Sequence, residues 1–212
     1  MANSTCVGAV QTNLLRVSRL LDGKWIDAGA SNLYRTDSVI EIVSNPVYTT
    51  GADLEQQNGA GAVCVSYKAA DSYKRHDLTM SLCTLDAELL EMLTGATLIA
   101  SGGNNIGAKF ADDPDTADYV CVEAWQLVIE DGAHTGEYVH WVWPKCRFRQ
   151  GQTTRNNGIL TIPLSGEAFI NRHVGLGPAG DWPAVLDVPD SWFIDDDIPA
   201  AVCGYQTAGT GS

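Results

Sequence analysis

The chain has 212 residues, of which 45% are hydrophobic and 18% are charged, a balance that buries a sizeable core and argues against intrinsic disorder. Its 26 acidic and 13 basic side chains give a formal net charge of −13, so the molecule as a whole repels a phosphate backbone, which disfavours ordinary DNA or RNA binding. The 21 glycines and 8 prolines are scattered, which indicates many turns between short strands. We expect a single β domain over residues 1–212, because all-β domains often exceed about 200 residues without splitting.

The first strand signal is the apolar run at residues 14–21, which stops at Asp22-Gly23. An Asp-Gly pair suits the positive φ angles of a tight hairpin turn. A return strand through Trp25 and Ile26 is therefore expected.

A second β-branched run occupies residues 39–43 and should end at Asn45-Pro46, because proline removes a donor from the strand ladder. Residues 45–61 then form a long loop. A loop of this length in a compact domain indicates a purpose, such as reaching a neighbouring subunit.

Residues 62–67 predict a further strand, followed by a polar, basic turn at residues 68–75 and an alternating strand at residues 77–83. The two strands form the clearest hairpin-like pair in the sequence. Tyrosines interleave with the basic residues of the turn, a pattern that also suits nucleic acid. At a net charge of −13, an ion-pairing contact with an acidic neighbouring subunit is the better interpretation.

A helix is predicted from Asp86 to Thr94, with Thr84 as its N-terminal cap and Gly95 as its C-terminal stop. Its apolar face should cover one side of a sheet. That face is formed by Leu85, Leu89, Met92 and Leu93.

A loop at residues 101–118 should precede two long antiparallel strands, at residues 119–129 and 137–149, joined by a turn at residues 130–133. In the second strand the basic side chains Lys145, Arg147 and Arg149 share one face, and Cys146 and Phe148 share the other. A short strand at residues 159–164 follows. The Gly- and Pro-rich residues 175–212 are expected to be an extended C-terminal segment.

The six cysteines, at positions 6, 64, 83, 121, 146 and 203, allow either three disulfides or reduced thiols. Reduced, intracellular thiols are favoured, because no closely spaced pair occurs and several cysteines lie inside apolar alternation. The N-terminus has no basic stretch followed by an apolar core, and no run approaches about 18 apolar residues. We therefore expect neither a signal peptide nor a membrane span.

Motifs for catalysis or metal binding are weak. Residues 175–180 match a dinucleotide-loop spacing, but Asp181-Trp182-Pro183 follows where a helix would have to begin, which favours a plain turn. His140 and Cys146 would lie about 20 Å apart on one strand, too far for one zinc ion that also used His134. The acidic residues 112–115 and 195–197 lack the donor spacing of a calcium loop. We expect no cofactor, no metal and no enzymatic activity, while a triad recognisable only by geometry stays open.

Residues 67–95 combine the pair Lys74-Arg75, an alternating strand, and an acidic Leu-Leu helix that closes with Thr94-Gly95. A second group of motifs consists of Trp143-Pro144-Lys145-Cys146-Arg147-Phe148, Asn157-Gly158 and Leu164-Ser165-Gly166-Glu167-Ala168. Both groups resemble segments of the major tail tube proteins of long-tailed bacteriophages (siphoviruses), especially phages of actinobacteria. The resemblance covers about residues 14–180.

The resemblance implies a mainly β fold, an antiparallel β-sandwich or small β-barrel with one flanking α-helix at about residues 85–94. It further implies hexameric rings that stack into a hollow tube, with the loop at about 45–61 clasping an adjacent subunit. Other tail proteins, namely the tape measure, terminator and distal tail proteins, would be partners, and DNA would pass through transiently. The protein would be made in the host cytoplasm and located in the virion tail.

The acidic excess suits such a conduit, because a lumen that weakly repels DNA has no sticking points. Ten side chains on the expected loop, basic turn and late strand are candidate subunit contacts: Tyr48, Leu54, Asn58, Lys68, Tyr73, Lys74, Arg75, Lys145, Arg147 and Arg149. Three alternatives remain at this stage. They are a head decoration protein, a tail terminator or other tail-completion protein, and a β-fold hydrolase or carbohydrate-binding module.

Overall fold

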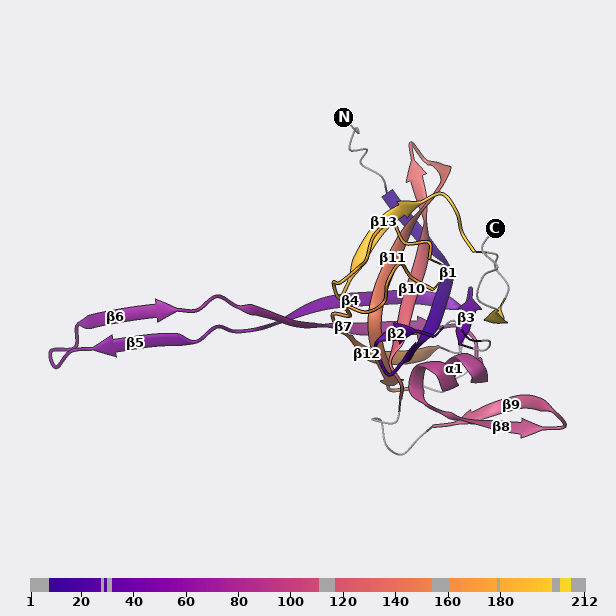
Figure 1. Ribbon diagram of the computed structural model, residues 1–212, viewed down its shortest axis with the longest axis horizontal. Coiled ribbons are helices and arrows are strands. Elements are labelled where there is room, and N and C mark those ends of the chain that lie inside the picture. The colour runs from indigo at the N-terminus through magenta and orange to yellow at the C-terminus, as the bar shows by residue number, and fades with distance from the viewer. Residues whose placement is uncertain are drawn as a thin grey trace.

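Fourteen strands and one helix make up the part of the chain that the computed structural model describes, which is residues 8–27, 29, 32–110, 117–153, 161–178, 180–199 and 203–206 (Figure 1). In chain order the elements are β1 (Gly8–Leu21), β2 (Trp25–Ile26), β3 (Leu33–Thr36), β4 (Val39–Thr49), β5 (Asp53–Gln57), β6 (Val63–Lys68), β7 (Ser72–Leu82), α1 (Ala87–Thr94), β8 (Thr97–Ser101), β9 (Asn104–Lys109), β10 (Val120–Glu130), β11 (Ala133–Gln150), β12 (Ile162–Ala168), β13 (Ser191–Asp195) and β14 (Gly204–Gln206).

The main sheet is antiparallel and has the strand order β14-β3-β1-β10-β11-β12-β7-β4, with β2 paired to β1 and β13 paired to β11. The sheet folds over on itself, so that β4 and β7 run across β1, β10 and β11 (Figure 1). Buried side chains from both layers, such as Leu15 of β1 and Met80 of β7, form one core. The predicted fold class, a mainly antiparallel β-sandwich with one flanking helix, is confirmed.

The two Asp-Gly turns are where the sequence places them. Asp22 and Gly23 have φ angles of 52° and 65°, and Asp131 and Gly132 have 49° and 80°. These left-handed values are those that a tight two-residue hairpin turn requires. The first turn returns the chain through β2, and the second joins β10 to β11, so both predicted hairpins are confirmed.

The prediction that Asn45-Pro46 ends a strand is wrong, because β4 continues to Thr49. Pro46 lies opposite His76 of β7, and the pairing runs without a shift from Glu41 to Val47 before an irregularity between Val47 and Tyr48. β4 is the last strand at its end of the main sheet, so the missing N–H of Pro46 removes no bond to a further described strand.

The predicted loop at residues 45–61 is also wrong, because the outer half of β4 and all of β5 occupy most of it. β5 pairs with β6, whereas β7 pairs with β4 and β12. The expected pairing of residues 62–67 with residues 77–83 is therefore incorrect, and the basic residues 68–75 lie mainly in β6 and β7 rather than in a turn. Together, residues 45–75 form a long two-stranded arm that projects from the body (Figure 1).

The helix α1 is present, with two local differences from the prediction. Its N-cap is Asp86, whose side chain accepts hydrogen bonds from the backbone N–H groups of Glu88 and Leu89, so Thr84 is not the cap. Leu85 precedes the helix and is exposed rather than part of the apolar face. Gly95 ends the helix with a φ of 68°, as predicted.

Later segments contain more strand than expected. The predicted loop at residues 101–118 is replaced in part by the hairpin β8–β9, while residues 111–116 lie outside the described residues. The predicted strand at 159–164 corresponds to β12, shifted toward the C-terminus, and residues 159–160 are likewise not described. The extended C-terminal segment contains β13 and β14.

That C-terminal segment covers the second face of the sheet. Val174 and Trp182 pack with Leu20, Cys121 and Val142 in a second, smaller cluster of buried residues. The central strands are therefore buried on both faces, which explains why their polar residues need partners inside the protein.

Candidate assembly surfaces

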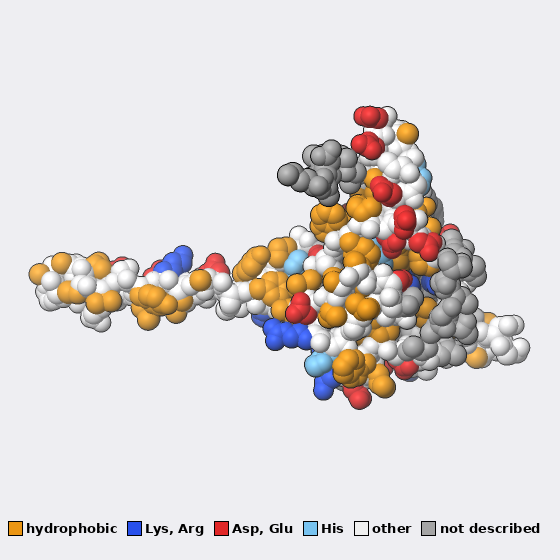
Figure 2. Space-filling model, turned by 45° about the horizontal axis from the view of Figure 1, so that its top comes forward, with side chains coloured by type: hydrophobic (Ala, Val, Ile, Leu, Met, Phe, Trp, Pro, Cys, Tyr) orange, Lys and Arg blue, Asp and Glu red, His pale blue; other side chains and the backbone are white. Residues whose placement is uncertain are grey.

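The outer end of the arm, formed by β5 and β6, exposes every one of its side chains. Leu54 lies opposite Tyr67 and Gln56 lies opposite Val65, so the pleat places Leu54, Val65 and Tyr67 on one side of the hairpin. These three side chains are about 60% exposed. Val63 is also exposed but lies opposite Gln57, beyond a shift in the pairing, and Figure 2 shows hydrophobic side chains along the projection.

The opposite side of the arm is polar. Asp53 lies opposite Lys68, and Glu55 lies opposite Ser66. At the tip, the Asn58 side chain accepts hydrogen bonds from the backbone N–H groups of Ala60 and Ala62. Of the predicted contact residues, Leu54 therefore belongs to the apolar face, Lys68 to the polar face, and Asn58 shapes the turn.

Tyrosines brace the arm where it leaves the body. Tyr48 of β4 and Tyr73 of β7 meet edge to face, with ring centroids 6.1 Å apart. Burial, with a smaller effect from Asp190, raises the pKa of Tyr73 to about 12. Nearby, the Ser44 hydroxyl donates to Asp190, 2.7 Å away, which ties this root of the arm to the C-terminal segment.

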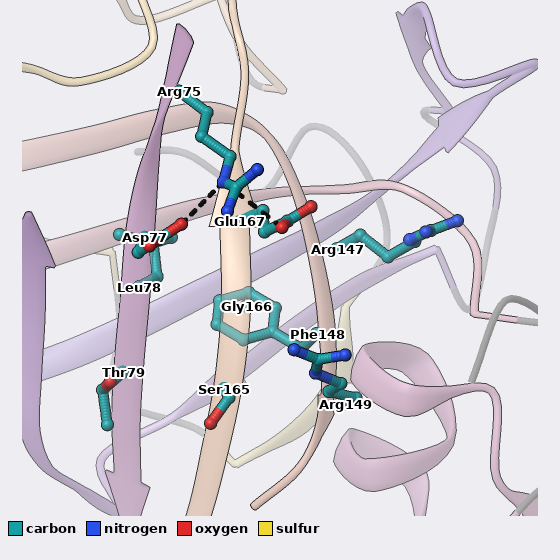
Figure 3. Close-up of a pocket in the computed structure, with 10 residues that line it drawn as sticks. All are labelled: Arg75, Asp77, Leu78, Thr79, Arg147, Phe148, Arg149, Ser165, Gly166 and Glu167. Carbon is teal, nitrogen blue, oxygen red and sulfur yellow. Dashed lines mark hydrogen bonds and ion pairs between the residues drawn. The ribbon is translucent and has the colours of Figure 1, made fainter. Parts of the chain in front are cut away.

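A groove of about 390 Å³ lies on the body beside the root of the arm, across β7, β12 and β11 (Figure 3). Arg75 of β7 contacts Asp77 at 2.7 Å and Glu167 of β12 at 3.2 Å. The hydrogen bond that Arg75 donates to Asp77 is the largest influence on the pKa of this guanidinium and raises it; desolvation opposes the rise, and the charges of Glu167 and Asp77 add to it. This part of the groove is already neutralised within the subunit.

The other part of the groove is a row of donors. Thr79 lies opposite Ser165, and Ser165 lies opposite Arg149, so two hydroxyls and a guanidinium follow one another across three strands. Arg149 is exposed and makes no ion pair with any carboxylate in the described part of the chain. Guanidinium and hydroxyl groups arranged this way suit a carboxylate or another anion.

The remaining predicted contact residues lie around these two surfaces. Arg147 lines the groove, and its guanidinium and the Lys145 ammonium lie 5.6 Å and 4.3 Å from the centre of the Tyr119 ring. Lys74 is exposed on β7 at the root of the arm. The structure thus brings Arg75, Arg147 and Arg149 together in one groove but leaves the outer arm residues far from it.

Sequence reasoning missed a buried charged network beneath the C-terminal segment. Arg16, Glu123 and His140 are almost fully buried on the neighbouring strands β1, β10 and β11. Arg16 donates two hydrogen bonds of 2.6 Å to Glu123 and also contacts Asp181 at 3.1 Å. Trp182 donates to the same Glu123 carboxylate at 2.8 Å.

The pKa values in this network follow from its charges. Burial alone would raise the pKa of Glu123, but the charge of Arg16 and hydrogen bonds from His140 and Arg16 outweigh burial and lower it to about 2. Burial likewise opposes ionisation of Arg16, yet the attraction of Glu123 raises the pKa of that guanidinium.

Glu123, His140 and Asp195 form a cluster of a histidine and two carboxylates, which lacks the nucleophile of a catalytic triad. The two ring nitrogens of His140 lie 3.1 Å from Glu123 and 3.2 Å from Asp195, so carboxylates occupy both positions and no described nucleophile bonds to the ring. The available signal was a charged residue or histidine inside an apolar run, as in Leu15-Arg16-Val17 and Val139-His140-Trp141.

The remaining candidates for a functional site are metal ligands and reactive thiols. They contain no group of three or more His, Cys, Asp or Glu side chains placed to hold a metal ion. Cys64, Cys83 and Cys203 are exposed free thiols, and burial raises the pKa of the Cys121 and Cys146 thiols. No helix in the described ranges has the length and apolar character needed to cross a membrane.

The sequence matches no protein-family model and no curated protein.

Proposed function

We propose that the protein is a structural subunit that assembles with copies of itself, and that the assembly is the tail tube of a long-tailed phage. The observation that carries the proposal is the arm, whose apolar face of Leu54, Val65 and Tyr67 is about 60% exposed. An isolated two-stranded hairpin is marginally stable in water. A neighbouring copy that covers the apolar face would stabilise it.

A second copy is the occupant that best explains the arm. Its polar face carries charges of both signs, with Asp53 opposite Lys68, so the arm is not specialised for a polyanion. Its apolar face is only two strands wide, and an exposed apolar sheet face of this kind can be buried against another sheet. Copies that each extend an arm onto the next make a repeating contact, and such contacts close into rings or continue into tubes.

The tail tube itself rests on the resemblance of residues 67–95 and on the charge of the chain. At −13, copies lining a channel present an acidic surface that DNA crosses without binding. Hexameric rings, the tape measure, terminator and distal tail proteins as partners, and the virion tail as location all belong to this proposal.

Negative-stain electron microscopy and light scattering of the purified chain test the proposal. Tubes or stacked six-fold rings are expected. A single ring that never stacks would favour a tail terminator, and a monomer that binds intact phage heads would favour a decoration protein. A persistent monomer at high concentration would reject self-assembly.

A matched pair of variants assigns the contact to the arm. Replacing Leu54, Val65 and Tyr67 with serine should abolish assembly, because the apolar face is lost. The control, Glu55→Gln with Ser66→Ala, changes the opposite face of the same hairpin and should assemble as the wild type does. Equal assembly by both variants would remove the arm from the proposal.

A further inference from the structure

The groove formed by Arg75, Thr79, Arg147, Arg149 and Ser165 differs in charge from the rest of this acidic chain. Three arginines line it, and the two lining carboxylates, Asp77 and Glu167, both contact Arg75, while the Arg147 guanidinium extends toward the Tyr119 ring (Figure 3). The row formed by Arg149, Ser165 and Thr79 has donors and no carboxylate. The groove therefore fits an acidic group from outside the subunit.

An acidic group of suitable shape lies at the far end of the molecule. The hairpin that joins β10 to β11 carries Glu130, Asp131 and Glu137, all of them exposed. No lysine or arginine occurs between residues 110 and 144 of the sequence. Asp195 of β13 pairs with Tyr138, which brings the following Asp196 and Asp197 to the same end. Figure 2 shows acidic side chains gathered at the top of the view and basic side chains at the lower left of the body.

The other projections of the chain fit the groove less well. The β8–β9 turn, at Gly102 and Gly103, carries no charge. The arm carries charges of both signs, and its polar face pairs Asp53 with Lys68. The β10–β11 tip is closed by a two-residue turn, so it is narrow, and it presents only acidic charge.

A subunit cannot place this tip in its own groove. Both lie on β11, the tip at Ala133 and the groove at Arg147 and Arg149. A strand rises about 3.3 Å per residue, so roughly 45 Å separates them. The contact has to be made between different copies, and it has to be head to tail.

We infer that the acidic β10–β11 tip of one copy docks in the arginine-lined groove of the next copy, so that subunits stack in one direction. The inference rests on the proposed self-assembly and adds the direction in which the subunits stack. Two acidic ends or two basic ends would repel each other, so the same charges that favour head-to-tail stacking disfavour the inverted arrangement.

Zero-length cross-linking tests the contact directly. Arg149→Lys keeps the positive charge and supplies an amine that a carbodiimide joins to a carboxylate only at contact distance. In concentrated protein, a cross-linked peptide between position 149 and Glu130, Asp131 or Glu137 is expected, identified by mass spectrometry. Cross-links from position 149 solely to other segments, or none at all, would overturn the inference whether or not tubes form.

Charge reversal tests whether attraction between the acidic tip and the groove contributes to stacking. Arg149→Glu, or Glu130→Lys with Glu137→Lys, should raise the concentration needed for stacking by roughly tenfold or more, because like charges then face each other. The combined variant should recover stacking, since each reversed charge regains an opposite partner. Asp131 is left unchanged because its φ of 49° belongs to the turn. Lys109→Glu and Asp187→Lys, exposed charges outside both surfaces, are the controls.

The outcomes separate this inference from the proposed function. Normal tubes from both reversed variants would overturn the docking and leave the tail tube proposal standing. A wild type that forms cross-linked dimers or short chains but no tubes would retain the docking and reject the tube. Duplex DNA binding that Arg149→Glu abolishes, without any cross-link to the tip, would assign the groove to a polyanion and overturn the inference.

Discussion

Arg16 and Glu123 lie directly opposite each other on β1 and β10, and the guanidinium donates two hydrogen bonds of 2.6 Å to the carboxylate. Both side chains are inaccessible to solvent. Asp181 and Trp182 of the C-terminal segment contact the same pair. The pair therefore links the centre of the sheet to the segment that covers it.

Removing the charge of Glu123 should destabilise the protein strongly. Glu123→Gln leaves Arg16 buried with only the partly exposed Asp181 as a charged partner, and breaking a buried pair in this way costs about 3–5 kcal/mol. Chemical denaturation should show the decrease in the free energy of unfolding. Glu137→Gln, an exposed carboxylate near the β10–β11 turn, is the control and should change stability by less than about 0.5 kcal/mol. A small effect of Glu123→Gln would mean that the pair contributes little.

The same carboxylate predicts a dependence of stability on pH. The pKa of Glu123 is lowered from 4.5 to about 2 in the folded protein, so its contribution is present above pH 4.5 and is lost as the pH falls toward 2. The size of that contribution is on the order of 3 kcal/mol. The difference in unfolding free energy between wild type and Glu123→Gln should therefore narrow between pH 4.5 and pH 2. A constant difference over that range would contradict the lowered pKa.

Gly177 should be intolerant of a side chain. A Cβ at this position would lie 2.4 Å from Nε1 of Trp182, the atom that donates to Glu123, and the φ of 88° also disfavours alanine. Gly177→Ala should displace Trp182, lower the thermal midpoint and shift tryptophan fluorescence toward that of a solvated indole. Gly180→Ala is the control for backbone strain, because Gly180 has a φ of 72° but open space around its Cβ position. A larger loss of stability in Gly177→Ala than in Gly180→Ala would therefore measure the clash with Trp182. Equal effects of the two changes would show that backbone strain alone is responsible.

Gly51 should control the shape of the arm. A Cβ there would lie 2.0 Å from the carbonyl oxygen of Ala69, so alanine forces the two chains of the arm apart. Gly51→Ala should accelerate tryptic cleavage after Lys68 several-fold and leave the thermal midpoint of the body unchanged, because the arm contributes nothing to the core. Gly59→Ala, at the open tip, should leave cleavage as it is. Unaltered cleavage in Gly51→Ala would show that the arm tolerates the wider spacing.

The sequence predicts the elements whose cause is local. The turns at Asp22-Gly23 and Asp131-Gly132 and the helix stop at Gly95 depend on φ angles that few residues adopt. The alternating strand that includes Leu78, Met80 and Leu82 depends on a two-residue repeat visible in the chain itself.

The incorrect predictions concern features that depend on segments far apart in the sequence. Pro46 ends a strand only if a further strand pairs on its free side, and its place at the end of the sheet is a property of the whole strand order. Residues 62–67 and 77–83 each form strands as predicted, but their partners are β5 for the first and β4 and β12 for the second. Alternation indicates a strand and says nothing about which strand lies beside it.

The sequence by itself therefore determined the mainly β class, the tight turns, the single helix and the acidic excess, because dihedral preference, side-chain period and charge act within a few residues or over the whole composition. Only the tertiary structure decided that Arg16 meets Glu123 across 107 positions, that Arg75, Arg147 and Arg149 share a groove, and that an apolar arm stands away from the body. Those relationships depend on which strands pair. Strand pairing is set by the burial of surfaces contributed by residues far apart in the chain.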